Sequence, residues 1–380
     1  MIALGAVVIR CAPPRKYAKR RPNIKNKVHW SRVICKEPGD YIGWPTVARK
    51  DDGELLAVFS GDREAHWCPY GKTEMVRSRD DGETWSEPET INNTPLDDRD
   101  AGAIVLRSGA IVLSWFTSPT WDHLERRRER AGDRAVDAWR RHCDKITEDV
   151  RQRWLGQWTR RSTDGGVTWE AEVDSIASAP HGPSELSDGR LLYVGTAKLG
   201  GRPALASVES IDEGRSWQVI GEIPVPKEDA EDLTYYEPHS VELTNGRIVC
   251  LWRYHPKQPP RDDAYMRQTE SDDGGKTWSV THPTPMWGYP PHLVRLHQGG
   301  LLASYGRRKA PFSQRACISH DGGETWDIES EIVLRDDAAD GDLGYPSTLE
   351  LAPGELLTVY YQIDRPGEKT SLIATRWSLD

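Results

Sequence analysis

SHDGGETW (residues 319–326) occurs in five variants along this chain of 380 residues. The other copies read SRDDGETW (78–85), STDGGVTW (162–169), SIDEGRSW (210–217) and SDDGGKTW (271–278). Asp and Gly favour tight turns, because Asp bonds nearby backbone N–H groups and Gly accepts a positive φ. Each box therefore predicts a turn, and its Trp is large enough to fill the gap between neighbouring units.

A second repeat lies between the boxes and consists of an apolar strand, a turn that ends in Gly, and another apolar strand. Its six copies span 45–60, 101–116, 182–195, 239–253, 292–306 and 347–361. Alternating apolar positions with Gly turns indicate antiparallel hairpins. One unit then has four strands, with the box between the third and the fourth. Six such units predict an all-β fold, a six-bladed β-propeller with four-stranded antiparallel blades.

The last unit reaches its third strand at 370–378 and then the chain ends. The segment HWSRVICKE (29–37) is a spare strand that would complete this unit and remove an open sheet edge. We expect residues 1–27 to be a poorly ordered N-terminal extension and residues 28–380 to form a single propeller domain. A charged, helix-favouring insert at 121–154 interrupts the second blade and is either a solvated surface helix, a lid or a dimer contact.

The composition of the chain limits the classes of partner that we expect it to bind. The net charge of −9 argues against a nucleic-acid surface, and no segment is long and apolar enough to suggest a membrane partner. The six Cys show no CxxC spacing, and the short apolar run near the start makes a poor signal peptide. We therefore expect a cytoplasmic protein, with secretion left open, and no cofactor.

Polar residues collect where the first strands begin and the second strands end. These positions lie at the rim opposite the boxes, so we expect a site there, around the central channel. Trp44, Glu237, Pro290 and Tyr345 each precede a Pro at matched places before an inner strand. Because Pro fixes the entry of the strand, the residue before it is free to point inward.

The boxes and the six units resemble the exo-sialidase (neuraminidase) superfamily over nearly the whole chain. Its members use a Tyr nucleophile activated by a Glu, an Asp as acid and base, and three Arg that bind the substrate carboxylate; sialidases are exceptions to the two-carboxylate rule of glycosidases. The resemblance implies that Tyr345 is the nucleophile and Glu237 its base. The Arg candidates that it implies are Arg63, Arg253, and either Arg307 or Arg308.

Two positions depart from the family pattern. Trp44 stands where the family has its first Arg, and Pro69 stands where the family has its acid/base Asp. His66 or Asp62 is then the candidate for proton transfer. Further candidates for substrate contacts are Trp44, Asp100, His181, His239 and His292. No HxH or HExxH spacing is present, so we expect no metal.

Three functions compete. The first is a sialidase-like glycoside hydrolase that cleaves a terminal acidic sugar, sialic acid or a related one, from a glycan by a retaining Tyr/Glu mechanism. The second is a polysaccharide lyase on a uronate chain, in which His66 or His239 takes the C5 proton and a Tyr protonates the leaving oxygen. The third is a carbohydrate-binding propeller without turnover. A glycan is the expected partner, and the 121–154 insert offers a surface for oligomer formation.

Overall fold

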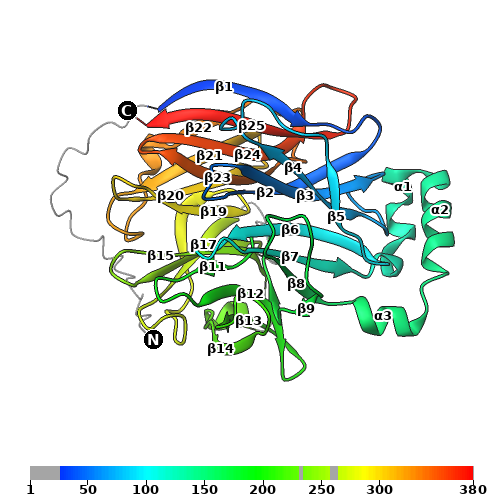
Figure 1. Ribbon diagram of the computed structural model, residues 1–380, viewed down its shortest axis with the longest axis horizontal. Helices are drawn as coiled ribbons and strands as arrows, with labels where there is room; N and C mark the ends of the chain where they lie inside the picture. The colour runs from blue at the N-terminus through cyan, green and yellow to red at the C-terminus, as the bar shows by residue number, and fades with distance from the viewer. Residues whose placement is uncertain (1–25, 231–233, 257–263, 380) are drawn as a thin grey trace, which may run out of the picture.

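The computed structural model describes residues 26–230, 234–256 and 264–379. Six antiparallel sheets, each built around four strands, follow one another as blades around a central axis (Figure 1), so the predicted six-bladed propeller is confirmed. Of the expected N-terminal extension, residues 1–25 lie outside the described residues. Among the helices of the described ranges, none has the length and apolar character needed to cross a bilayer.

The first three blades occupy the N-terminal part of the chain. Blade 1 contains β2 (Tyr41–Arg49), β3 (Leu55–Arg63), β4 (Lys72–Ser78) and β5 (Glu89–Asn92). Blade 2 contains β6 (Asp97–Val105), β7 (Ile111–Ser118), β8 (Gln157–Ser162) and β9 (Val173–Asp174). Blade 3 has a divided inner strand and contains β10 (Ala177–Ser178), β11 (Ser184–Glu185), β12 (Leu191–Leu199), β13 (Arg202–Ser210) and β14 (Gln218–Glu222).

The last three blades complete the ring. Blade 4 contains β15 (Tyr235–Glu242), β16 (Ile248–Tyr254), β17 (Tyr265–Ser271) and β18 (His282–Trp287). Blade 5 contains β19 (Pro291–Arg295), β20 (Leu301–Arg307), β21 (Ser313–Ser319) and β22 (Ile332–Arg335). Blade 6 contains β23 (Gly344–Ala352), β24 (Glu355–Ile363), β25 (Thr370–Leu379) and, from the other end of the chain, β1 (Asn26–Cys35).

The ring is closed by the first described strand. β1 runs antiparallel to β25, in register from Asn26 opposite Leu379 to Cys35 opposite Leu372. Figure 1 shows the blue strand β1 beside the red strand β25. The spare strand expected at 29–37 thus supplies the outer strand of blade 6. This pairing covers the outer edge of β25, which would otherwise be open.

The five boxes share one set of hydrogen bonds. In the box of blade 4, Ser271 donates to Asp273, and Asp273 accepts from the backbone and the hydroxyl of Thr277. The same contacts recur in the other four boxes. The Trp278 indole reaches Ser207 of blade 3 at 3.1 Å. Box tryptophans therefore join neighbouring blades, as the sequence predicts.

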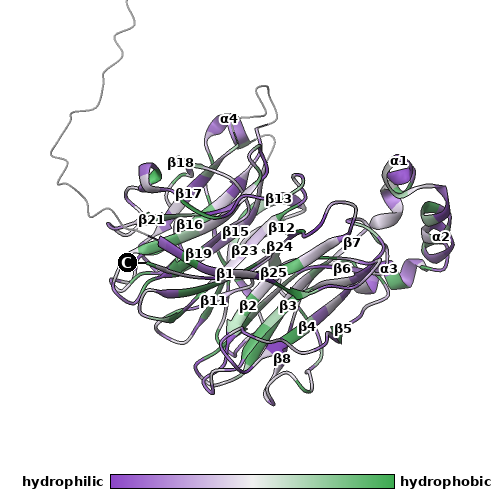
Figure 2. Ribbon diagram, turned by 90° about the horizontal axis from the view of Figure 1, so that it is seen from above, coloured by the Kyte–Doolittle hydropathy of each residue, from purple (hydrophilic) through white to green (hydrophobic). Residues whose placement is uncertain are grey.

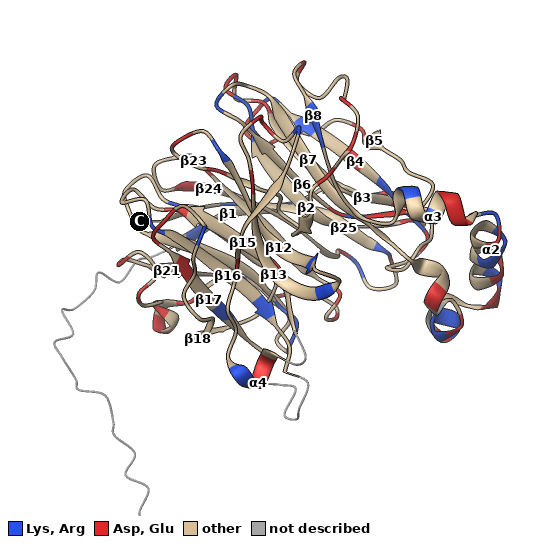
Figure 3. Cartoon of the chain, turned by 90° about the horizontal axis from the view of Figure 1, so that it is seen from below, with Lys and Arg blue, Asp and Glu red and all other residues tan. Residues whose placement is uncertain are grey.

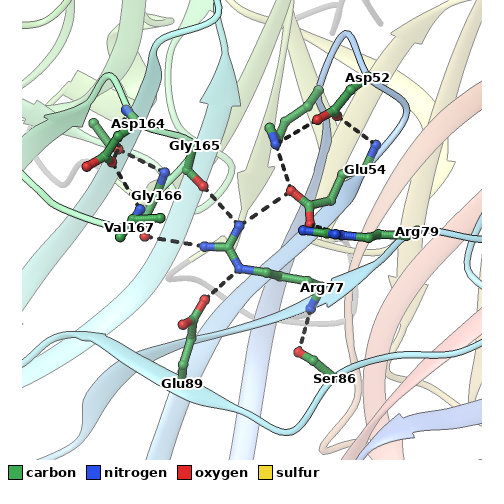
Figure 4. A network of polar contacts seen from close by, with 12 residues as sticks. Asp52, Glu54, Arg77, Arg79, Ser86, Glu89, Asp164, Gly165, Gly166 and Val167 are labelled. Atoms are coloured by element: carbon green, nitrogen blue, oxygen red, sulfur yellow. Dashed lines mark hydrogen bonds and ion pairs between the residues drawn. The ribbon is translucent and has the colours of Figure 1, made fainter.

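The blades are held together by apolar seams and by a few polar links. Each of the six seams contains its own cluster of buried apolar side chains. Figure 4 shows a polar link between blades 1 and 2, where Arg77 donates to the carbonyls of Gly165 and Gly166. Arg77 also pairs with Glu54 and Glu89 of its own blade. The link joins a strand of one blade to the box of the next.

The segment between β7 and β8 is helical and stands out from the body of the propeller (Figures 1 and 2). Charges of both signs cover α2 (Figure 3), but Trp139 is buried and donates to Glu64 of blade 1. The segment between β7 and β8 consists of two 3-10 helices (Thr120–His123 and Glu125–Arg127), α1 (Arg128–Ala131), α2 (Asp133–Cys143) and α3 (Glu148–Trp154). Two short elements lie elsewhere, α4 (Lys227–Ala230) and a 3-10 helix at Ile328–Ser330.

Candidate active site

Four inner strands enter their blades through the same backbone distortion. Trp44, Asp100, Glu237 and Tyr345 have φ of 56°, 53°, 48° and 51°, and in each strand the pairing register breaks at that point. A side chain at positive φ costs about 1–3 kcal/mol, and such bulges aim a side chain away from the sheet. The sequence pattern matched three of these positions and missed Asp100, because Ala101 rather than Pro follows it. The pattern also matched Pro290 before β19, which does not have a positive φ.

Glu237 and Tyr345 meet at the channel, although they are far apart in the chain. The Tyr345 hydroxyl donates to Oε1 of Glu237 at 2.6 Å. Arg253 of β16 donates from Nη1 to both oxygens of Glu237, at 2.9 and 2.7 Å. The Nε of Arg253 donates to Nε2 of His255 at 2.8 Å. The arrangement holds a phenol, a carboxylate and a guanidinium in one fixed chain of contacts.

The protonation of this group follows from its surroundings. Burial by itself would raise the pKa of Glu237, but Arg253 and the Tyr345 hydroxyl outweigh burial and lower that pKa. Burial, Asp100 and Glu237 together raise the pKa of Tyr345 well above its usual value. The resting state is therefore a neutral phenol that donates to a carboxylate. A phenol so placed can pass its proton to Glu237 only as its oxygen forms a new bond.

A second guanidinium lies beside Tyr345. The Arg308 guanidinium lies 5.7 Å from the Tyr345 ring centre, and it donates to the Leu343 carbonyl and to the Tyr361 hydroxyl. Its neighbour Arg307 turns away, with its guanidinium 6.0 Å from the Trp287 ring. Of the two arginines that the sequence could not separate, Arg308 is the one near Tyr345. The structure does not bring Arg307 to this group.

Trp44 lies beneath the site. It is 1% exposed and so does not offer the substrate contact expected from the sequence. The Arg99 guanidinium stacks at 4.2 Å from the Trp44 ring centre and donates to the carbonyl of His66. The Arg63 guanidinium of blade 1 lies 4.8 Å from the same ring centre. Two guanidinium groups, one from blade 1 and one from blade 2, therefore lie beside the position where the resemblance lacks an arginine.

The structure does not place Arg63 and Asp62 at the channel. Arg63 is fully buried and pairs with Asp97 through Nη1 at 2.6 Å and Nη2 at 3.2 Å. Asp62 forms an ion pair with Lys72 of the neighbouring strand β4. Arg63 therefore links blades 1 and 2. The structure does not place Arg63 for the expected contact with an anion, nor Asp62 for the expected proton transfer. Sequence position after β3 could not show which way these side chains turn.

His66 lies at the rim but is tied to its neighbours. Its Nδ1 is 2.9 Å from the Tyr41 hydroxyl and 3.3 Å from Oδ1 of Asp342. Burial lowers the pKa of His66, and Asp342 opposes the shift only in part. Asp342 also accepts from Tyr361, and these donors lower its pKa to about 2 against the effect of burial. Asp342 follows no recognisable motif and was not among the expected site residues.

Three expected histidines form a buried cluster. His239 stacks on His292 with ring centres 4.3 Å apart, and His181 lies 4.8 Å from His292. Nδ1 of His239 accepts from the backbone N–H of Leu293, and Nδ1 of His181 is 3.1 Å from the Thr46 hydroxyl. In the described part of the chain, no group of three or more His, Cys, Asp or Glu is arranged to hold a metal ion.

Protonation of this cluster should destabilise the fold in acid. Burial lowers the pKa of His239 to about 4, and burial with the neighbouring histidine rings lowers the pKa values of His181 and His292 well below the usual value. Their neutral forms therefore stabilise the fold fully above pH 6.5, and this stability is lost as the pH falls from 6.5 toward 4. Each histidine should contribute a slope of about 1.4 kcal/mol per pH unit.

The measurement is urea unfolding of the wild type and of His292→Gln between pH 7.5 and 4.5. The free energy of unfolding should fall less steeply with acid in the variant. His320→Gln is the control, because His320 is exposed on a box, and its curve should follow that of the wild type. Parallel curves for His292→Gln and the wild type would contradict the role assigned to the cluster.

One pocket is lined by Glu237, and a second is lined by Arg308, the neighbour of Tyr345. We name the first the leaving-side pocket. It has a volume of about 600 Å³, and its lining includes Asp100, Gln157, Lys198, Tyr236 and Glu237. The second pocket has about 500 Å³ and is lined by the loop after β3, the helical segment and the loop before β23. Its polar and aromatic lining includes His66, Trp67, Arg127, Arg308 and Asp342.

The fold is a six-bladed propeller of the kind seen in sialidases of known structure. The chain belongs to the family described as the BNR repeat-like domain, whose model matches residues 144–357, more than half of its length.

Among solved structures, a protein of unknown function from Dyadobacter fermentans is 23% identical with a TM-score of 0.76, covering 95% of this chain and 100% of that one. A Hadza microbial sialidase is 17% identical with a TM-score of 0.61, over 89% of this chain and 66% of that one. An α-L-arabinofuranosidase from Fusarium graminearum is 15% identical with a TM-score of 0.60, over 92% and 98%. At these identities the likeness shows the fold.

Two curated relatives are similar to this chain over only part of their own length. A xyloglucanase from Acetivibrio thermocellus is 25% identical over 187 residues, 44% of this chain and 20% of that protein. A sialidase from Paraclostridium sordellii is 20% identical over 305 residues, 76% of this chain and 57% of that protein. The chain therefore spans about a fifth of the xyloglucanase and little more than half of the sialidase.

Proposed function

We propose that the protein is a retaining glycoside hydrolase that removes a terminal acidic sugar from a glycan. The observation that carries the proposal is the hydrogen bond from the Tyr345 hydroxyl to the carboxylate of Glu237, which also accepts a hydrogen bond from Arg253. A phenol is a weak nucleophile at neutral pH, and a base within 2.6 Å removes its proton as it attacks. The sialidases among the similar structures support the same reaction class.

That the proposed sugar is acidic is inferred from the positive charges around Tyr345 and Glu237. Arg308 lies over the Tyr345 ring and lines the second pocket, and Arg253 lies next to Glu237. Guanidinium groups bind carboxylates in two-pronged geometry, so this charge favours an anionic sugar. A tyrosine nucleophile suits such a sugar, since its neutral oxygen is not repelled by the substrate carboxylate.

The lyase alternative has less support. His239 accepts a backbone hydrogen bond within the buried cluster, and burial lowers its pKa to about 4. Nδ1 of His66 already faces Tyr41 and Asp342. Neither histidine offers the available base near neutral pH that removal of a C5 proton needs.

The test is fluorophore release by the wild type from 4-methylumbelliferyl α-sialoside, beside the matching α-L-arabinofuranoside and a uronate polymer. Release from the sialoside alone is the expected result. Release from the arabinofuranoside alone would replace the acidic sugar with a neutral one. An unsaturated uronate product would support the lyase. Binding without turnover of any probe would leave a carbohydrate-binding propeller and overturn the proposed activity.

A further inference from the structure

We propose that Asp100 is the general acid and base of this reaction, and that the leaving-side pocket holds the part of the glycan that departs. The inference rests on the proposed function and adds to it the group that transfers the proton. The juxtaposition that carries it is a buried, unpartnered carboxyl that shares one pocket with Glu237.

The backbone aims Asp100 as it aims the nucleophile and its base. Asp100 occupies the same left-handed bulge position in β6 that Glu237 occupies in β15 and Tyr345 in β23. Three blades thus direct a phenol and two carboxyls to one end of the channel. Strained positions of this kind persist where a function needs the side chain.

The hydrogen bonding of Asp100 is incomplete. The residue is 8% exposed, and across the described ranges no group bonds to its buried Oδ1. A buried polar atom without a partner costs about 1–3 kcal/mol, so a fold gains nothing by keeping it for structure alone. The same carboxyl lines the leaving-side pocket. A ligand oxygen in that pocket would supply the missing partner.

The surroundings of Asp100 suit a group that both gives and takes a proton. Burial raises the pKa of Asp100 to about 7, with Arg99 and Arg253 opposing the shift and Glu237 adding to it. The most effective acids and bases titrate near the working pH. The titratable and charged groups that act on it are Arg63, Arg99, Tyr193, Glu237, Arg253 and Tyr345.

Other carboxyls near the rim are already committed. Asp98, two residues earlier, is also buried, but its oxygens accept from the backbone and hydroxyl of Thr94 and from Asn92. Asp342 accepts from three donors at Oδ1 and is ionised, so it has no proton to give. Asp174 lies in the same pocket but is exposed, and it accepts from the Ile176 N–H.

The reaction then balances in two steps. In the first, Asp100 gives its proton to the glycosidic oxygen, which leaves with the electron pair of its bond to the anomeric carbon. The Tyr345 oxygen bonds to that carbon, and the phenolic proton passes to Glu237. In the second, Asp100 takes a proton from water, and the water oxygen bonds to the anomeric carbon. The bond to Tyr345 breaks, and its oxygen recovers the proton from Glu237.

The decisive experiment compares Asp100→Asn with Asp98→Asn on two glycosides. 4-Methylumbelliferyl α-sialoside has a good leaving group that needs little acid help, whereas sialyllactose has a poor one. Asp100→Asn should lower kcat/KM for sialyllactose by about 10²–10⁴-fold and lower that for formation of the aryl product far less. Asp98→Asn is the matched control, since it removes a buried carboxyl of the same strand that lies outside the pocket, and it should affect both substrates alike.

A second readout does not depend on the leaving group. The wild type should lose kcat/KM above about pH 7, as Asp100 loses its proton, and Asp100→Asn should lose this alkaline limb. With Asp100→Ala, added azide should attack the glycosyl–tyrosine intermediate and give a glycosyl azide of retained configuration, seen by mass spectrometry. Asp98→Ala should give none.

The outcomes separate the two proposals. If the wild type turns over both glycosides and Asp100→Asn lowers both equally, with an unchanged pH profile and no azide product from Asp100→Ala, the role of Asp100 is overturned and the proposed function stands. If the wild type turns over neither, the proposed function fails and this inference fails with it.

Discussion

Tyr345→Phe should reduce release of the fluorophore from 4-methylumbelliferyl α-sialoside by on the order of a thousandfold or more, because loss of a nucleophile removes the covalent pathway. The change deletes one oxygen atom and leaves the ring in its place among Trp44 and Tyr361. Binding of the substrate should change little, since the positive groups Arg253 and Arg308 remain. The measurements are kcat and KM for both proteins. Mass spectrometry of enzyme trapped during turnover shows whether the glycosyl–tyrosine adduct forms.

The protein contains its own control for this variant. In blade 5, Tyr305 donates to Glu331 at 2.6 Å, and Glu331 is bound by Arg315. This second chain of phenol, carboxylate and guanidinium repeats the contacts of the site in a part of the blade that lines neither pocket. Tyr305→Phe should therefore keep full activity. Equal activity of Tyr345→Phe and the wild type would mean that the pair at the channel is structural.

Asp97→Asn should lower the free energy of unfolding by about 3–5 kcal/mol, because it leaves the fully buried Arg63 guanidinium without its counter-charge. The substitution preserves shape, so the loss measures charge rather than packing. Because the pair joins blades 1 and 2, the variant should also open that seam first. Urea unfolding measures the loss, and hydrogen exchange of β3 and β6 reports the seam.

An exposed pair provides the comparison. Arg202 and Glu222 in blade 3 form two hydrogen bonds, at 2.8 and 2.6 Å, but both side chains face solvent. Glu222→Gln should produce little or no measurable change, since exposed pairs are screened by water and salt. Losses of the same size in both variants would show that burial of Arg63 and Asp97 adds nothing to their interaction.

The fold was predictable because its signals are local and repeated. Each box fixes a turn through contacts within eight residues, and the strand pattern between boxes counts the blades. Ring closure was predictable for a different reason: residues 370–378 lack a partner in the pattern, and residues 29–37 lack a place in it. Both observations concern numbers of strands, which a sequence records directly.

The site was only partly predictable. Tyr345, Glu237 and Trp44 share a Pro at the next position, so their equivalence could be read, whereas Asp100 has Ala at that position and was taken only as a substrate contact. Whether a side chain faces the channel or a seam depends on the neighbouring blade, and for this reason Arg63 was misplaced.

Arg99 and Asp342 show the same limit from the other side. Arg99 reaches Trp44 across a seam, and Asp342 is recognisable only by the donors that converge on it from Tyr41, His66 and Tyr361. Contacts of this kind join residues that are distant in the chain, and no spacing in the sequence encodes them.

The pairing of β1 with β25 also bears on how the chain is made. β1 is the first strand of the described propeller in sequence order, yet its partner β25 is the last. Until β25 is made, β1 has no partner strand and blade 6 is incomplete, so strand edges stay exposed in the growing chain. We expect ring closure to follow synthesis of β25 and to be the slowest step of folding, because it joins segments more than 330 residues apart. Chains that stop short of β25 should depend on chaperones or aggregate.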